Sequence, residues 1–162
     1  MNSKDLIDHL GLIPHPEGGF YKQTYHSTLG TNTPRGQRSL YTSIYFLLRS
    51  EDVSHFHRLQ SDELWYYHGG STLTVHMITP EGEYKQIKLG LNVARGEVPQ
   101  FVVPRYTIFG SSVDEEDTFS FVGCMVSPGF DFKDFELFDK QELLDKYPEH
   151  RDVIERLAIE GK

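Results

Sequence analysis

The stretch SHFHRLQSDELWYYHGG, residues 54–70, gathers histidines, carboxylates and aromatic residues into what reads as a strand, a turn and a second strand. In an extended strand successive side chains point to opposite faces. His55 and His57 are therefore expected to share one face, with Phe56 on the other. The first strand is predicted to present two imidazoles to one side of a sheet.

The second strand of this stretch follows a turn at residues 60–62. The same alternation puts Glu63, Trp65 and Tyr67 on one face. Two imidazoles and a carboxylate are then expected to converge. The stretch is predicted to form one wall of a ligand pocket.

Outside this stretch, residues 20–126 divide into about nine short β-rich runs separated by Gly, Pro, Asp and Asn. This pattern is typical of a β-sandwich or barrel. Short helices are expected only at the ends. Ser3 is expected to cap the first, which Gly11 ends, and the spacing of Asp139 and Glu142 indicates a capping box for the C-terminal helices.

Composition limits the partners. The 16 Lys and Arg residues against 24 Asp and Glu residues give a net charge of −8, which argues against nucleic acid or an anionic membrane. The single cysteine allows no intrachain disulfide, and no apolar run reaches the roughly 20 residues of a membrane helix. The N-terminus has no signal-peptide pattern, so a soluble cytoplasmic protein with a small-molecule ligand is expected.

Several blocks resemble one family. The spacing of His55, His57, Glu63 and Gly70 is similar to the first cupin motif, with five residues between His57 and Glu63. The blocks PHPEGGF (14–20), SIYFLL (43–48) and SPGFDF (127–132) resemble the cupin-5 family of the cupin superfamily, whose architecture is RmlC-like.

The resemblance implies an all-β fold, a double-stranded β-helix or cupin jelly-roll barrel with short N- and C-terminal helices. Residues 1–162 are expected to form one domain, with the barrel core at about 18–138 and helices at about 139–160. It also implies a homodimer. The apolar run 43–48 is predicted to be buried on both sides, at a covered sheet or a subunit interface.

No cofactor is certain from the sequence, and a divalent metal held by His55, His57 and Glu63 is one hypothesis. The second cupin motif, however, places Phe109 where a further histidine ligand is expected. The alternative leaves His55 as an ordinary strand residue. His57 then hydrogen-bonds Asp62 or Glu63.

A metal-free hypothesis makes His57 and Glu63 catalytic, with His57 as general base oriented by a carboxylate. A tyrosine would then return the proton. The candidates are Tyr45, Tyr66, Tyr67 and Tyr106, and the sequence does not choose among them. The alternative is that these tyrosines have only a packing role in the domain.

Further residues are predicted to contact the ligand. These are Glu17, Tyr45, Asp62, Trp65, Gln100 and Phe109. For Glu17 a turn-stabilising role is an equal alternative, and Trp65 and Phe109 suit a plain core as well. Cys124 is expected to be a buried small hydrophobe.

The sequence therefore predicts a barrel that binds a small polar metabolite, a carbohydrate or a nucleotide sugar. An epimerase-like or metal-dependent enzyme using His57 and Glu63 is the alternative. Sequence alone does not separate binding from turnover.

Overall fold

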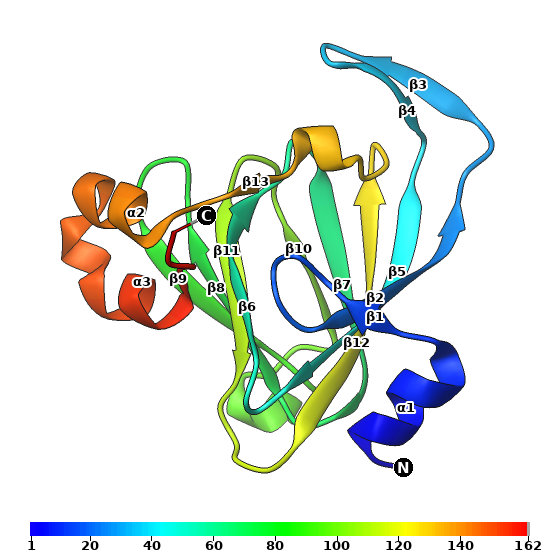
Figure 1. The fold of residues 1–162 in the computed structure, drawn as a ribbon. Coiled ribbons are helices and arrows are strands. Elements are labelled where there is room, and N and C mark those ends of the chain that lie inside the picture. The colour runs from blue at the N-terminus through cyan, green and yellow to red at the C-terminus, as the bar shows by residue number, and fades with distance from the viewer. Residues whose placement is uncertain (162) are drawn as a thin grey trace.

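Two antiparallel sheets face each other in the computed structural model, which describes residues 1–161 (Figure 1). The six-stranded sheet has the order β1 (Ile13–Pro14), β2 (Phe20–His26), β5 (Thr42–Arg49), β12 (Phe119–Ser127), β7 (Asp62–Gly70) and β10 (Gln100–Val103). The five-stranded sheet has the order β13 (Glu136–Leu137), β6 (Val53–Arg58), β11 (Ile108–Val113), β8 (Leu73–Ile78) and β9 (Tyr84–Leu89). The expected all-β jelly roll is confirmed.

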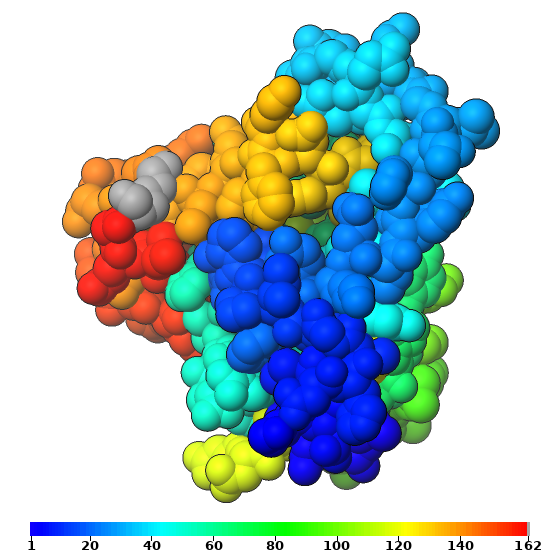
Figure 2. Space-filling view, turned by 45° about the vertical axis from the view of Figure 1, so that its right-hand side comes forward, coloured from blue at the N-terminus to red at the C-terminus, as the bar shows by residue number. Residues whose placement is uncertain are grey.

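A separate hairpin, β3 (Gly30–Thr33) and β4 (Gly36–Ser39), extends from the barrel as an arm. In Figure 2 the arm stands at the top of the molecule, against the segment that follows β12. That segment contains the short 3₁₀ turn η2 (Phe132–Asp134). Two other 3₁₀ turns are η1 (Val93–Arg95) and η3 (Pro148–His150).

The three α-helices lie at the ends of the chain: α1 (Ser3–Leu10), α2 (Lys140–Lys146) and α3 (Arg151–Leu157). Asn2, rather than Ser3, caps α1, because the Asn2 side chain accepts the Asp5 N–H in a capping box. The predicted capping box of Asp139 is present in α2. None of the helices among residues 1–161 is long and apolar enough to cross a bilayer.

Burial divides into two cores. The first fills the space between the sheets and includes Phe46, Trp65, Phe109 and Val122. The second lies between the outer face of the five-stranded sheet and the C-terminal helices, where Phe56 meets residues such as Leu143, Ile154 and Leu157. The C-terminal helices therefore cover the five-stranded sheet, and a polar pocket opens from the inter-sheet space.

The second half of the apolar run 43–48 in β5 is buried, as predicted, whereas residues 43–45 are only partly buried. Phe46, Leu47 and Leu48 are successive residues that are almost fully inaccessible to solvent. Phe46 and Leu48 face the inter-sheet core, and Leu47 faces the opposite side, where α1 packs against β5. The chain therefore covers part of this outer surface by itself.

A β-bulge in β6 changes the predicted facing of the histidines. The register with β11 pairs His57 with Phe109 but Ser54 with Ser111, so two residues of β6 lie opposite Gly110. A Cβ at Gly110 would lie 2.5 Å from the Ser54 carbonyl oxygen, so glycine permits the close approach. The bulge breaks the alternation of side chains along β6. Ser54 and His57 therefore share one face and both contact the Glu17 carboxylate, whereas His55 and His57 do not share a face.

Candidate functional site

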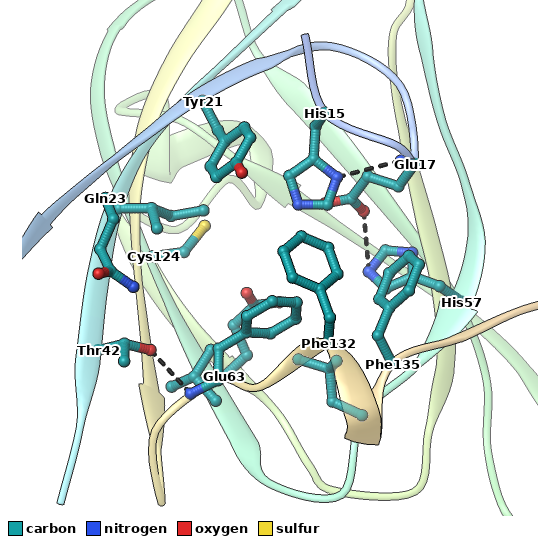
Figure 3. A pocket seen from close by; sticks show the side chains of 14 residues that line it. His15, Glu17, Tyr21, Gln23, Thr42, His57, Glu63, Cys124, Phe132 and Phe135 are labelled. Atoms are coloured by element: carbon teal, nitrogen blue, oxygen red, sulfur yellow. Dashed lines mark hydrogen bonds and ion pairs between the residues drawn. The ribbon is translucent and has the colours of Figure 1, made fainter. Parts of the chain in front are cut away.

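A pocket of about 200 Å³ opens between the inner face of the six-stranded sheet, strand β6 and the loop after β12 (Figure 3). Two histidines and two glutamates line it, and three phenylalanines cover its loop side. The lining consists of His15, Glu17, Tyr21, Gln23, Thr42, Ile44, His57, Leu59, Glu63, Cys124, Val126, Phe130, Phe132 and Phe135.

Two glycines bring Glu17 into the barrel. Gly18 and Gly19 both have positive φ angles, 109° and 75°. A Cβ on Gly18 would lie 2.0 Å from the Val53 carbonyl oxygen, so only glycine allows the loop to sit against β6. The Glu17 carbonyl then accepts the backbone N–H of His55 at 2.6 Å. The pair of glycines therefore serves close backbone approach as well as a turn.

Glu17 and His57 form a buried ion pair. The His57 Nε2 lies 2.9 Å from Glu17 Oε2, which also accepts the Ser54 hydroxyl at 2.6 Å. The other His57 nitrogen, Nδ1, donates to the His55 carbonyl at 2.7 Å. Because both ring nitrogens face acceptors, the doubly protonated imidazolium is favoured.

The two pKa values follow from this geometry. Burial opposes charge on both groups, but the His57 charge and the hydrogen bonds from His57 and Ser54 lower the pKa of Glu17 to about 2. Burial likewise lowers the pKa of His57, and the Glu17 charge and hydrogen bond outweigh it, so that pKa is raised. The pair is ionic at neutral pH.

His15 is neutral. Its Nδ1 accepts the backbone N–H of Glu17 at 3.0 Å, which leaves the proton on Nε2. Nδ1 also lies 3.4 Å from Glu17 Oε1, but this is not an ion pair while the ring is neutral. Burial lowers the pKa of His15, against the pull of Glu17. His15 therefore offers an N–H donor to the pocket.

Glu63 is a protonated acid. Burial, followed by the negative charge of Glu17, raises its pKa to about 8, against the opposing effects of His57 and the Trp65 indole. The Trp65 Nε1–H donates to Glu63 Oε2 at 3.1 Å. Among residues 1–161 no second hydrogen bond fixes the other Glu63 oxygen. That oxygen is available to a ligand.

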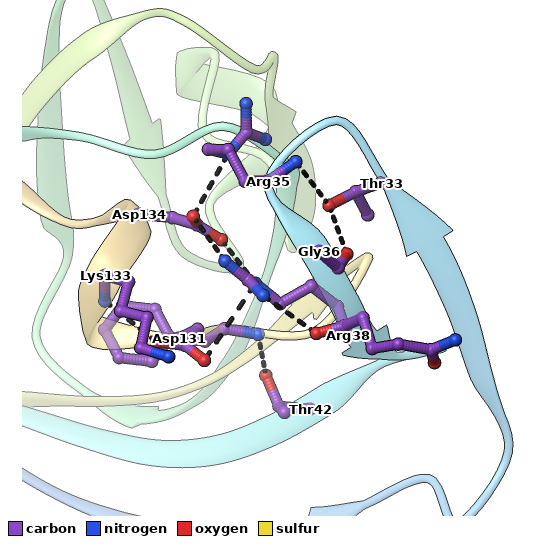
Figure 4. Close-up of polar contacts among 10 residues, drawn as sticks. Thr33, Arg35, Gly36, Arg38, Thr42, Asp131, Lys133 and Asp134 are labelled. Carbon is purple, nitrogen blue, oxygen red and sulfur yellow. Dashed lines mark hydrogen bonds and ion pairs between the residues drawn. The ribbon is translucent and has the colours of Figure 1, made fainter.

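The aromatic side of the pocket is tied to the arm. Phe132 is 51% exposed at the mouth, and its ring lies 4.8 Å from that of Phe130. Asp134, in the same turn, accepts Nε of Arg38 at 2.9 Å and Nε of Arg35 at 3.0 Å (Figure 4). These ion pairs join the β3–β4 arm to the loop that bears the phenylalanines, so the arm helps to hold the pocket wall.

Comparison with known proteins agrees with this fold. A model of the Cupin_5 family, described as cupin superfamily (DUF985), matches residues 4–138. The chain belongs to the Cupin_5 family. Uncharacterized protein YML079W of Saccharomyces cerevisiae is 31% identical to this Cupin_5 protein over 146 residues, or 81% of this chain and 72% of the yeast protein.

Solved structures extend the likeness. A hypothetical protein from Leishmania major is 41% identical, with a TM-score of 0.94 over 99% of this chain and 100% of that one. A protein from Shewanella oneidensis is 52% identical, with a TM-score of 0.93 over 99% of each chain. Oxalate decarboxylase from Bacillus subtilis, 15% identical with a TM-score of 0.56 over 92% of this chain and 38% of that one, shares the fold alone.

The metal hypothesis does not fit this Cupin_5 site. His55 Nδ1 lies 2.8 Å from the Glu17 carbonyl oxygen rather than facing Glu63, because the bulge turns it away. Both nitrogens of His57 already have protein partners. Within residues 1–161 no three His, Cys, Asp or Glu side chains are grouped to hold a metal ion. His55, His57 and Glu63 therefore do not form the predicted ligand set.

Other predicted ligand contacts have different places. Tyr45 packs on Phe121 on the outer face of the six-stranded sheet, and Gln100 shares that face because it pairs with Tyr66. Asp62 accepts the Arg105 backbone N–H at 2.8 Å, outside the pocket. The predictions that these three side chains line the pocket are not supported by their positions.

The remaining predicted residues lie at the site or directly behind it. Glu17, His57 and Glu63 line the pocket. Trp65 is buried behind Glu63, and Phe109 is buried with its ring 4.2 Å from that of His57. Cys124 is buried as predicted but also lines the pocket, and burial raises the pKa of its thiol.

Sequence reasoning missed part of the pocket. His15, Tyr21, Gln23 and Thr42 were not singled out, nor were the phenylalanines of residues 130–135. The signal was present, because the blocks PHPEGGF and SPGFDF contain His15 and two of those phenylalanines. Neither block shows from its spacing alone that it folds over the barrel mouth.

Proposed function

We propose that this protein binds a small polar metabolite in the pocket and moves a proton on it, as an isomerase or epimerase does. The observation that carries the proposal is two buried carboxyl groups in one pocket with unequal partners. Glu17 is held by His57 and Ser54, whereas Glu63 accepts the neutral Trp65 indole N–H, and this difference lowers the pKa of Glu17 to about 2 and leaves that of Glu63 raised to about 8. Pairs of acids pushed apart in this way are typical of acid–base sites.

Glu63 has the role of proton carrier. A pKa near the working pH lets one carboxyl group both take a proton from carbon and return it. In such a step the ionised form of Glu63, a minority of the molecules at pH 7 because its pKa is about 8, takes the proton as the C–H bond next to a carbonyl breaks and its electron pair forms the enolate. Return of the proton to the neighbouring carbon or to the opposite face completes isomerisation or epimerisation without a co-reactant.

His15 and the ion pair support this step. The Nε2–H of His15 can donate to the carbonyl oxygen of the substrate, where negative charge develops. His57 holds Glu17 in place through Nε2, 2.9 Å from the carboxylate, and is a positioning residue in this proposal. This assignment replaces the sequence-based hypothesis that His57 itself is the base, since neither of its nitrogens is free.

The proposal is tested by exchange of carbon-bound hydrogen in D₂O. Purified protein is incubated with small hydroxyaldehydes and hydroxyketones, and loss of the proton signal next to the carbonyl is followed by NMR. We expect exchange with the wild-type protein and a decrease of about 10²–10⁴-fold in Glu63→Gln, because general acid–base groups contribute that much.

Gln100→Ala serves as the control, because Gln100 lies on the outer face of the same sheet. It should exchange at the wild-type rate. Equal exchange by Glu63→Gln and wild type would remove Glu63 from the reaction. Saturable binding without any exchange would reject the enzyme and leave a metabolite-binding protein.

A further inference from the structure

The charge of the pocket restricts what it can hold. No lysine or arginine is present among its 14 lining residues within the described chain. The one cation, His57, has both ring nitrogens bonded to protein acceptors. An anionic group entering the pocket would meet the Glu17 carboxylate and find no free positive charge to offset its loss of water.

A cationic group is matched no better. Glu17 Oε2 already accepts hydrogen bonds from Ser54 and His57, and the His57 charge balances that of Glu17. Glu63 receives the Trp65 indole N–H at one oxygen and lies buried beside an existing carboxylate. The charges inside the pocket thus cancel without a ligand.

The uncharged contacts suit hydroxyl and carbonyl groups. His15 offers one N–H, and Tyr21 and Gln23 extend from alternate positions of β2 into the pocket (Figure 3). Facing them are the rings of Phe130, Phe132 and Phe135, whose negative faces attract the C–H groups of a sugar. One wall can therefore hydrogen-bond the polar groups of a ligand, and the other can pack against its carbon atoms.

The size of the pocket suits a small ligand. Its volume is about 200 Å³. This space suits a small compound.

We propose that the pocket selects a small uncharged hydroxy-carbonyl compound, such as a short sugar, and discriminates against acids, phosphates and amines of the same size. The proposal rests on the proposed function for the carbonyl group, but its claim about charge is independent of turnover. It also narrows the sequence-based expectation, because an uncharged sugar rather than the phosphates of a nucleotide would occupy the pocket.

The test measures binding, not catalysis. Calorimetry or saturation-transfer NMR compares erythrose, erythronate, erythrose 4-phosphate and choline against the full-length protein at pH 7. We expect erythrose to bind at least tenfold more tightly than each charged compound. Tighter binding of any charged compound than of erythrose would overturn the proposal. So would the absence of detectable erythrose binding from a 50-fold molar excess over the protein up to about 50 mM.

A variant that adds a cation supplies a second test. Gln23 lies at the exposed edge of the pocket, so Gln23→Arg can fold normally and should shift the preference toward erythronate by at least tenfold. Gln100→Arg makes the same change on the outer face of the same sheet and should leave the preference unchanged. An equal shift in both variants would show that net charge alone acts, and no shift in either would contradict the charge argument.

The outcomes separate this inference from the proposed function. Erythrose binding without hydrogen exchange rejects the reaction and retains the selectivity for uncharged compounds. Exchange on a charged substrate retains the reaction and rejects the selectivity.

Discussion

Two buried carboxyl groups in one pocket repel each other when both are ionised, so each raises the pKa of the other. Here the conflict is resolved by unequal partners. Glu17 has the His57 imidazolium and the Ser54 hydroxyl, whereas Glu63 has only the neutral indole of Trp65. The proton therefore resides on Glu63, and its titration should be visible in the stability of the whole protein.

The sign of this effect follows from linkage. The pKa of Glu63 is about 8 in the folded protein and 4.5 by reference for an unperturbed glutamate, so the folded state binds more protons between these values. The contribution of Glu63 to the free energy of unfolding is fully present below about pH 4.5. It is lost as the pH rises toward 8, by up to about 1.4 kcal/mol per pH unit. Glu63→Gln should remove this slope.

Urea denaturation at pH 5, 6, 7, 8 and 9 measures the slope. His57 keeps its own contribution in the variant, because its raised pKa also favours the folded state at lower pH. Glu81→Gln, in an exposed turn, is the control and should follow the wild type. Parallel curves for Glu63→Gln and wild type would show that Glu63 is ionised in the folded protein.

At the scale of elements, the loop before β2 decides whether Glu17 enters the barrel at all. Gly18→Ala should destabilise the protein in two ways, through its positive φ of 109° and through a Cβ only 2.0 Å from the Val53 carbonyl oxygen. The first effect amounts to about 1–2 kcal/mol. The second should add about 1–3 kcal/mol, as other overpacked positions do.

Gly96→Ala separates the two effects. Gly96 also has a positive φ, 89°, but a Cβ there would meet no atom within 4 Å. Urea denaturation should therefore place Gly96→Ala between wild type and Gly18→Ala. If the two variants lost equal stability, close packing of the loop on β6 would not be needed to position Glu17.

The elements also show how far sequence reasoning reaches. The Asp139 capping box and the burial of Phe46, Leu47 and Leu48 in β5 were predicted correctly, because both features depend on neighbouring residues in the sequence. The facing of His55 failed, because one extra residue in β6 shifts every side chain beyond it to the other face. Gly110, an isolated glycine in a strand, was the available sign of that bulge.

The pocket was predictable only in part for a related reason. Glu63 and His57 lie in the strand pair that first suggested a site, and alternation alone places Glu63 inside. The partner of His57 is different. Glu17 comes from a loop about 40 positions earlier, and only the folded backbone shows that its carboxylate, rather than Asp62 or Glu63, reaches the imidazole.

The outer face of the six-stranded sheet gives the whole molecule an apolar surface. Register places Leu64, Tyr66, Phe121 and Met125 on this face, and none of them is fully buried. Val102 of β10 continues the surface and is 46% exposed. Connected apolar surfaces of this kind on a soluble domain usually mark an interface.

We propose that a second copy of the chain covers this face, as the sequence resemblance led us to expect. A two-fold axis would bring the same face of both chains together, and a stable dimer would bury on the order of 1,600 Å². Two chains of 18.7 kDa give 2 × 18.7 = 37.4 kDa, the mass expected from light scattering at micromolar concentration.

Charge placed on the face should separate the copies. Val102→Glu is expected to give a monomer of 18.7 kDa without unfolding, because the side chain it replaces is already 46% exposed. Leu91→Glu is the matched control, since Leu91 is 67% exposed outside the sheet, and it should remain dimeric. A wild-type mass of 18.7 kDa would reject the dimer, and a dimeric Val102→Glu protein would mean that the copies meet through another surface.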